Sequence, residues 1–312
     1  MDFLLNNWLL IAFIAPFFWA FANIIDACFV EEVYKNEYDG TVITGFMQII
    51  PWLTVPFIGL TIPDVKITLL AITAGFLVIS SYFFYFKALF VTRDATLILI
   101  LWNVVAIIVP VLSFFFLNEK LTLLQYSGIF LIFLAALHLT SDKKIKKENV
   151  KKVILLMAGT TILWSLSLVA SREVYLKASF YSGMMFFSLG SIMAGTIFYL
   201  LRKRKRNNIS LSNIQKKYFK WIFLEEILTL FGLIASQRAI NLSPAVAFVA
   251  VIESIQPAFI VMSSATAFFL LSLFSFRKIK IMEKIRNDQL IGIGSKAFAI
   301  IAMAIGIYMI NI

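Results

Sequence analysis

The chain has 312 residues, of which 61% are hydrophobic and only 14% are charged, and its mean hydropathy is +0.91. Soluble domains are typically about 45–50% apolar and about 25% charged, so this composition excludes a soluble fold and indicates a protein embedded in lipid. A single cysteine, Cys28, and a single histidine, His138, exclude a disulfide framework, a Cys/His zinc site and a Cys–His nucleophile pair. We therefore expect no metal, no cofactor and no enzymatic activity.

The net charge of +11 is typical of nucleic-acid-binding proteins, but here the basic residues lie in a few short loops. Such clustering indicates membrane topology, because basic loops stay on the cytoplasmic side. Most of the lysines and arginines lie in the predicted loops 142–152, 202–217 and 277–288. These loops are therefore expected inside and both termini outside. The basic run 202–206 is expected to contact anionic lipids, and no nucleic-acid partner is expected.

Ten apolar stretches recur along the chain, each long enough for a helix to cross a hydrocarbon core of about 30 Å. They cover residues 8–30, 41–60, 67–91, 95–117, 121–140, 152–175, 181–201, 218–242, 244–275 and 289–311. They are too long for membrane strands and do not alternate as strands do, so helices are predicted. No cleavage motif follows the first stretch, which is therefore expected to remain as a helix.

The ten stretches divide into two sets of five with matching features in the same order. Trp19-Ala20 in the first stretch corresponds to Trp164-Ser165 in the sixth. Residues 87–89 correspond to 238–240, and continuing without gaps aligns 97–101 with 248–252. A Gln-x-x-Gly-Ile motif opens both the fifth stretch, at Gln125, and the tenth, at Gln289. Ordered matches of this kind indicate a duplication.

An odd number of helices in each copy means that the second copy enters the membrane from the opposite side. Inverted repeats of this kind are typical of alternating-access transporters, which bind substrate near the midplane between the halves. The sequence therefore predicts an all-α polytopic membrane protein of ten transmembrane helices in two inverted five-helix repeats, residues 1–141 and 142–312.

These motifs resemble those of the drug/metabolite transporter superfamily, specifically its EamA-type ten-helix members. The resemblance covers nearly the whole chain and is most specific at residues 117–122 followed by Gln125-x-x-Gly128. The second half keeps Pro257 but lacks the matching Glu-x-Leu-Thr motif, and the first half has Ala106 where the family has a proline. The resemblance implies a carrier of metabolites, amino acids or drugs in the bacterial cytoplasmic (inner) membrane. It also implies cytoplasmic termini, the opposite of what the charge pattern indicates.

Glu253 is the sharpest candidate for chemistry, because ionisable groups inside a membrane are costly and usually face a cavity or a partner. It lies about 14 Å into the ninth stretch at 1.5 Å per residue, close to the midplane. Gln256 follows on the same face. Glu253 is a candidate proton-coupling or substrate-amine site. The alternative is a structural ion pair with Lys296, or with another neighbouring helix.

Other polar and aromatic side chains are predicted to line a substrate path. Trp19, Asn23 and Asp26 share one helical face, and Glu225, Thr229, Gly232 and Ser236 form a stripe on the eighth stretch. The full set of predicted lining residues is Trp19, Asn23, Tyr85, Trp102, Asn103, Trp164, Glu253 and Gln256. The alternative is that the aromatic residues are core filler or interface anchors.

Several further residues are expected to be structural. Glu119 is expected to provide a hydrogen bond or helix cap. Gly128, Gly292, Gly294 and Gly306 suit close helix packing. At least one of Glu225 and Glu226 is expected to be solvated or ion-paired, because Lys217 and Lys220 lie about one turn away.

The sequence predicts a secondary transporter that moves a small organic solute by alternating access, as a monomer or homodimer. A flippase for a lipid or lipid-linked precursor is the alternative. A cavity open sideways to lipid would favour the flippase, and a closed polar cavity would favour a soluble metabolite.

Overall fold

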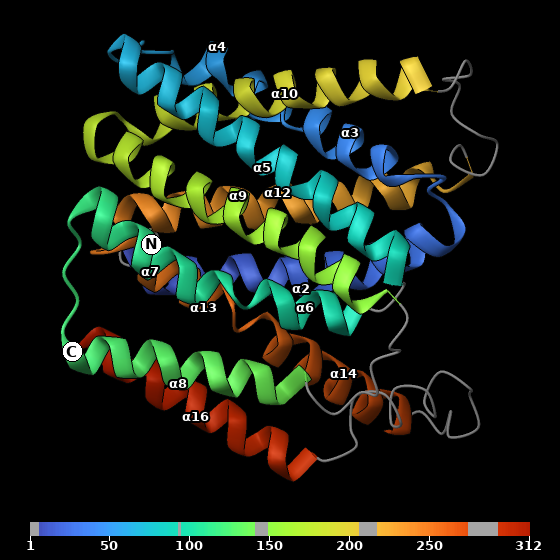
Figure 1. The fold of residues 1–312 in the computed structure, drawn as a ribbon, viewed down its shortest axis with the longest axis vertical. Helices are drawn as coiled ribbons and strands as arrows, with labels where there is room; N and C mark the ends of the chain where they lie inside the picture. Colours follow the sequence, from blue (N-terminus) through green and yellow to red (C-terminus); the bar gives the residue numbers. More distant parts are fainter. Residues whose placement is uncertain (1–5, 93–94, 141–148, 206–216, 274–292) are drawn as a thin grey trace.

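A computed structural model describes residues 6–92, 95–140, 149–205, 217–273 and 293–312. In this part of the chain every regular element is helical, and the long helices lie side by side as one bundle (Figure 1). The elements are α2 (Trp8–Glu32), α3 (Glu37–Met47), η1 (Ile50–Thr54), α4 (Val55–Ile58), α5 (Val65–Thr92), α6 (Ala95–Trp102), α7 (Val105–Leu117), α8 (Leu123–Thr140), α9 (Val150–Lys177), α10 (Phe180–Lys205), α12 (Phe219–Leu242), α13 (Val246–Glu253), α14 (Gln256–Leu273) and α16 (Ile293–Asn311).

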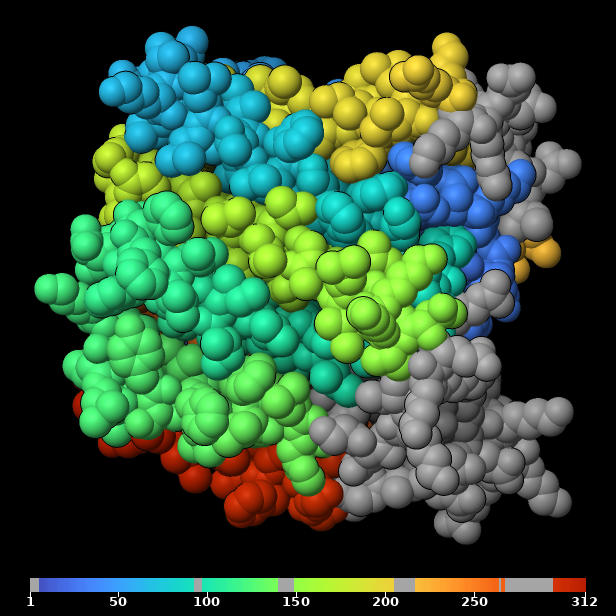
Figure 2. Space-filling view, in the orientation of Figure 1, coloured from blue at the N-terminus to red at the C-terminus, as the bar shows by residue number. Residues whose placement is uncertain are grey.

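Eight helical segments in the described ranges are long and apolar enough to cross a membrane. Large apolar side chains also face outward, among them Phe115, Leu155 and Phe298, each more than 70% exposed. Figure 2 shows one such face, where α5, α9, α7 and α8 form a continuous surface. Exposed apolar side chains of this size need lipid around them, so the chain is an integral membrane protein.

Two of the ten predicted stretches do not meet the same standard of length and apolarity. The stretch 121–140 forms α8, whose apolar part is the shorter segment Leu123–Leu139. The stretch 218–242 forms the 24-residue helix α12, which carries Lys220, Glu225, Glu226 and Arg238. Both are nevertheless helices packed into the bundle, α8 against α16 and α12 against α2.

Three of the predicted helices are interrupted, which the sequence did not predict. The stretch 41–60 breaks after α3 at Gln48 and continues as η1 and α4, and the other two breaks correspond to each other. The stretch 95–117 breaks at Asn103 and Val104, between α6 and α7, and the stretch 244–275 breaks at Ser254 and Ile255, between α13 and α14. The two breaks fall at aligned positions of the predicted repeat.

The backbone hydrogen bonds at the two breaks also correspond. The amide of Val104 donates to the carbonyl of Leu101 at 3.3 Å, and the amide of Ile255 donates to Ile252 at 3.1 Å. Both are tight bonds to the third residue back, as in a 3₁₀ turn. Each of the two stretches therefore makes one tightened turn at the bundle centre before its helix resumes.

The pairs of helices that pack together also correspond between the halves. Helix α5 packs on α9 as α12 packs on α2, and α7 packs on α9 as α13 and α14 pack on α2. Helices α8 and α16 pair at one edge of the bundle, and α3 and α10 pair at the opposite edge (Figure 1).

The first turn of α2 and the last turn of α16 lie at the same end of the bundle (Figure 1). The last turns of α8, α10 and α14, which lead into the three basic segments, lie at the opposite end. This arrangement agrees with the sequence-based expectation that the termini and the basic loops are on opposite sides. Residues 277–288, like Gln289 and Gly292, lie outside the described residues.

Glu119 acts as a structural cap, as predicted from the sequence. Its two carboxylate oxygens accept from the amide of Val246, the first residue of α13, at 3.2 and 3.1 Å. Nε of Arg172 lies 3.5 Å from the same carboxylate, and the guanidinium also donates to the carbonyls of Ile240 and Pro244. One buried ion pair therefore satisfies the end of α12 and the beginning of α13. Arg172 lies within α9, the helix predicted over 152–175.

The closest approach of α8 and α16 depends on two glycines. A Cβ atom at Gly128 would lie 2.8 Å from the carbonyl oxygen of Gly306, and one at Gly306 would lie 2.6 Å from a side-chain carbon of Ile132. Gly294, which the sequence also assigned to close packing, has no atom of the described residues within 4 Å of its Cβ position. Within the described part of the chain, the close packing expected at Gly294 is therefore absent.

The two glycines of α16 provide a matched test. Gly306→Leu should lower the free energy of unfolding by about 3 kcal/mol, because overpacking a close contact forces the helices apart. Gly294→Leu should change it by less than about 0.5 kcal/mol. Thermal unfolding in detergent, followed by size-exclusion recovery, measures both. Equal stability of the two variants would contradict the close contact between α8 and α16.

Candidate functional site

Five aromatic rings meet near the centre of the bundle and are called the aromatic box: Trp19, Tyr82, Tyr85, Trp102 and Trp164. The rings of Trp19 and Trp102 contact Trp164 at centroid distances of 5.5 and 5.1 Å. Tyr82 contacts Trp164 at 6.0 Å, and Tyr85 contacts Trp102 at 6.1 Å. These tilted and edge-to-face arrangements are favourable for aromatic pairs. The box joins α2, α5, α6 and α9, and Trp102 is the last residue before the first helix break.

Polar groups of α2 lie against one side of the box. The hydroxyl of Tyr85 donates to Oδ1 of Asn23 at 3.0 Å and to Oδ2 of Asp26 at 3.2 Å. The other oxygen of the Asp26 carboxyl group is buried without a hydrogen-bond partner. On the far side, Nε1 of Trp19 donates to the backbone carbonyl of Thr229 at 3.3 Å, which ties the box to α12.

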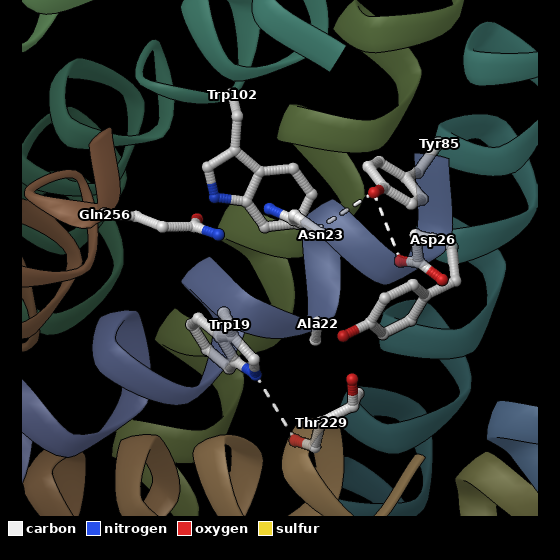
Figure 3. A pocket seen from close by; sticks show the side chains of 9 residues that line it. Trp19, Ala22, Asn23, Asp26, Tyr85, Trp102, Thr229 and Gln256 are labelled. Atoms are coloured by element: carbon white, nitrogen blue, oxygen red, sulfur yellow. Dashed lines mark hydrogen bonds between the residues drawn. The ribbon is translucent and has the colours of Figure 1, made fainter. Parts of the chain in front are cut away.

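These side chains surround a small cavity of about 20 Å³ (Figure 3). It is lined by Trp19, Ala22, Asn23, Asp26, Tyr82, Tyr85, Trp102, Thr229 and Gln256. This volume holds about one water molecule, whereas pockets for small organic ligands are about 300–1,000 Å³. The cavity is therefore nearly closed in this conformation, and a solute requires it to open.

The structure brings most of the sequence-predicted lining residues together. Trp19, Asn23, Tyr85, Trp102 and Gln256 line the cavity directly, and Trp164 packs behind them in the aromatic box. Asn103 lies in the helix break, almost fully buried, with its amide nitrogen unpartnered. Figure 3 shows Gln256 approaching from the second broken helix, opposite Tyr85.

Glu253 lies beside the cavity and does not line it. It is the last residue of α13, and its Oε1 accepts from the hydroxyl of Ser236 on α12 at 2.5 Å. The indole of Trp164 faces the same carboxyl group, although its N–H does not reach full hydrogen-bond geometry. Its contacts are therefore to α12 and α9, whereas Lys296, proposed from sequence as its partner, lies on α16, which packs on α8.

The stripe predicted on the eighth stretch faces the site along its length. Thr229 lines the cavity and Ser236 donates to Glu253. Between them, a Cβ at Gly232 would lie 2.5 Å from Nε1 of Trp19, so the tryptophan sits in the space left by the glycine. The helical spacing of these residues predicted that they share one face. Their contacts with Trp19 could not be predicted, because they depend on how α2 packs against α12.

Two carboxyl groups on α12 are buried where the sequence indicated solvent or an ion pair. Glu225 and Glu226 are 3% and 1% exposed. Glu225 accepts from the hydroxyl of Thr229, and Glu226 accepts from the hydroxyl of Thr44 on α3, both at 2.8 Å. The prediction that at least one of them is solvated or paired with a nearby lysine is therefore wrong. Helix α3 covers this side of α12, and the side chains of Lys217 and Lys220 are exposed.

Asp26 and the two glutamates are electrostatic neighbours. Glu225 interacts with both Asp26 and Glu226, and Asp26 also interacts with Glu226. Each of the three keeps one buried oxygen without a hydrogen-bond partner. We call these three residues the acidic group. In the described part of the chain, no set of three His, Cys, Asp or Glu residues has the arrangement of a metal site.

Comparison with known proteins supports the fold and leaves the function open. No family model and no curated protein matches the chain. Among solved structures, 28 chains match. One of them, titled "Crystal structure of protein", superposes with a TM-score of 0.66 over 98% of this chain and 99% of that chain, at 15% sequence identity. At this identity the likeness shows a shared fold alone.

The burial of Glu226 can be tested through its single hydrogen-bond partner. Thr44→Val should lower the free energy of unfolding by about 1–3 kcal/mol, because it leaves a buried carboxyl oxygen unsatisfied. Thr73→Val is the matched control, since Thr73 is on the outside of α5 and bonds only to the carbonyl of Leu69, and a change below about 0.5 kcal/mol is expected. Denaturation of the purified variants in detergent measures both. A solvated Glu226 would make Thr44→Val as mild as the control.

Proposed function

We propose that the protein is a secondary transporter that moves a small organic solute by alternating access through the central cavity. The observation that carries the proposal is the position of the cavity, where aromatic and polar side chains meet beside two aligned helix breaks. Interrupted helices near the midplane, facing each other across an internal repeat, are a recurring design of substrate sites in secondary transporters.

The proposed topology is ten transmembrane helices in two inverted five-helix repeats. It rests on the corresponding breaks at Val104 and Ile255, on their matching backbone hydrogen bonds, and on the exchange of packing partners between the halves. In this topology α8 and α12 complete the count, because α8 falls short only in length and α12 buries its two glutamates, Glu225 and Glu226, inside the bundle. We further propose membership of the EamA-type branch of the drug/metabolite transporter superfamily, in a bacterial cytoplasmic membrane.

Buried ion pairs lie toward both ends of the bundle and fit a closed intermediate. Glu119 and Arg172 join α12 and α13 toward the end that carries the termini. At the opposite end Arg202 of α10 lies 2.8 Å from the fully buried carboxylate of Asp39 on α3. Opening the cavity to one side requires the helices at that end to part, while the pair at the other end holds.

The small volume of the cavity favours a soluble solute over the flippase alternative. The nine lining residues come from α2, α5, α6, α12 and α14, and all are buried except Asn23 and Trp102, which are partly exposed. A lipid substrate requires an opening between helices toward the bilayer that is wide enough for an acyl chain. A volume of about 20 Å³ instead fits the closed form of a site for a compact molecule.

Glu253 is proposed as the group that couples transport to protons. It is buried beside the aromatic box and ends the helix segment that leads into the second break. The groups that face it are Ser236 of α12, Trp164 of α9 and Tyr82 of α5. A change in its charge therefore acts on α12 and α5, two of the five helices that line the cavity.

Alternating access can be tested without knowing the solute. Ala22 lines the cavity, and Ala12 lies on the same helix, fully buried and away from it. In a Cys28→Ser background, Ala22→Cys should react with a membrane-impermeant methanethiosulfonate reagent at least about tenfold faster than Ala12→Cys. The measurement is mass spectrometry of protein in proteoliposomes. Equal protection of both introduced thiols from both sides would show that the cavity does not open, contrary to the proposal.

Coupling by Glu253 predicts a change in how opening depends on pH. The labelling rate of the Ala22→Cys protein should vary with pH and become flat when Glu253→Gln is added, which keeps the shape and the bond to Ser236. Glu173→Gln removes a carboxyl group that pairs with Lys177 on the outer part of α9 and should leave the pH profile unchanged. An unaltered profile in a stable protein carrying Glu253→Gln refutes the coupling role.

A further inference from the structure

The aromatic box has the composition of a receptor for positive charge. Two indole rings and two phenol rings line the cavity, and the indole of Trp164 packs behind them, with neighbouring centroids 5.1–6.1 Å apart. The faces of aromatic rings carry negative electrostatic potential, and Trp provides the strongest attraction for a cation. Quaternary and methylated ammonium groups are bound in cages of this kind. An uncharged apolar solute would gain nothing from the negative electrostatic potential of these rings.

The charges around the cavity have the same sign. Asp26 contributes a carboxyl group to the lining, and the nine lining residues include no Lys, Arg or His. Behind Asp26 lie Glu225 and Glu226, which complete the acidic group. These three carboxyl groups interact with neighbouring hydroxyl groups and with one another. The electrostatic potential of the cavity therefore favours a cation and opposes an anion.

The carboxyl group of Asp26 is oriented and yet incompletely satisfied. Tyr85 donates to Oδ2 and so fixes the side chain against the box, while Oδ1 is buried without a partner. In Figure 3 the carboxyl group of Asp26 lies beside Tyr85 at the edge of the cavity. A buried carboxyl oxygen without a partner is costly. A bound cation or ammonium N–H beside it would remove that cost.

We propose that the solute of this site is a small organic ammonium ion, held by the aromatic box and by the carboxyl group of Asp26. This inference rests on the proposed transport function and adds the substrate class. The rings supply the surface for the alkyl groups around nitrogen, and Asp26 supplies the opposite charge. Asn23 and Gln256 are placed to bind a hydroxyl or carbonyl group carried by the same molecule.

The test compares a cation with an uncharged molecule of the same shape. Choline is used as the probe, and neohexanol, in which carbon replaces the ammonium nitrogen, is the isostere. Isothermal titration calorimetry on the full-length protein in lipid nanodiscs measures equilibrium binding and needs no flux. We expect saturable binding of choline that is at least about tenfold tighter than that of neohexanol, a difference of about 1.4 kcal/mol. Equal affinities, or binding of neohexanol alone, overturn the proposal.

Variants assign the binding to this cavity. Asp26→Asn should weaken choline at least about tenfold and leave neohexanol unchanged. Trp102→Leu, which retains every carboxyl group, should weaken choline by a similar factor and serves as the second variant if Asp26→Asn does not fold. Glu173→Gln removes a carboxyl group outside the cavity and should bind choline like the parent protein. Parent-like choline affinity in folded Asp26→Asn or Trp102→Leu overturns the assignment.

The failure of this inference can be distinguished from failure of the proposed function. If the thiol of Ala22→Cys becomes accessible but neither choline, tetramethylammonium nor benzylammonium binds, transport stands and the cationic substrate class is wrong. If these cations bind while that thiol stays protected from both sides, they bind outside the closed cavity, and both the proposed function and the assignment to this site are overturned. Binding of an anionic probe such as benzoate in preference to benzylammonium also overturns the proposal.

Discussion

The lack of hydrogen-bonding partners in the hydrocarbon of a membrane governs this structure. Every polar group inside the bilayer must be satisfied by the protein itself, which makes each departure from helix expensive. This chain nevertheless interrupts two helices at its centre and places Asn103, Asp26 and Glu253 around the interruptions, all at least 95% buried. Hydroxyl groups of Tyr85 and Ser236 satisfy two of the carboxyl groups in part. The polar centre and the broken helices are therefore one feature, which the surrounding apolar helices enclose.

The same constraint explains the ends of the bundle. Arg172 and Glu119 satisfy backbone groups at the junction of α12 and α13, and Arg202 neutralises the buried Asp39. These pairs are local and can each form or separate with movement of a few helices, whereas the glycine contact between α8 and α16 has little freedom because backbones touch there. Backbones also touch between α5 and α10, where a Cβ at Gly75 or Gly190 would lie 1.8 Å from a backbone carbonyl oxygen. Each of these glycine contacts restricts the sliding of its two helices.

Hydropathy predicted the helices well, because apolar length is a direct requirement of the bilayer. The break at Asn103 was not predicted, since no glycine or proline lies beside it. The break at Ser254 lies three residues before Pro257, which has no amide hydrogen to donate to the carbonyl of Glu253, and this signal was not used. Aromatic and amide residues at helical spacing predicted a lining that includes Trp19, Asn23 and Tyr85. Sequence reasoning placed Glu225 and Glu226 near solvent, because neighbouring lysines are visible in the sequence while the covering helix α3 is not. Long-range contacts such as Glu226 with Thr44 depend on packing that no local pattern contains.

The central claim is that the cavity opens alternately toward the two ends of the bundle. Double electron–electron resonance tests it with one spin-labelled pair at each end, in a Cys28→Ser background. At the basic end the labels replace Glu31 and Lys203. At the end that carries the termini they replace Lys120 and Tyr181. All four side chains are exposed. The account predicts two distance populations for each pair in lipid nanodiscs, with a shift in pH moving the two pairs in opposite directions. A single unchanging distance for both pairs would show that the bundle is rigid and would contradict alternating access.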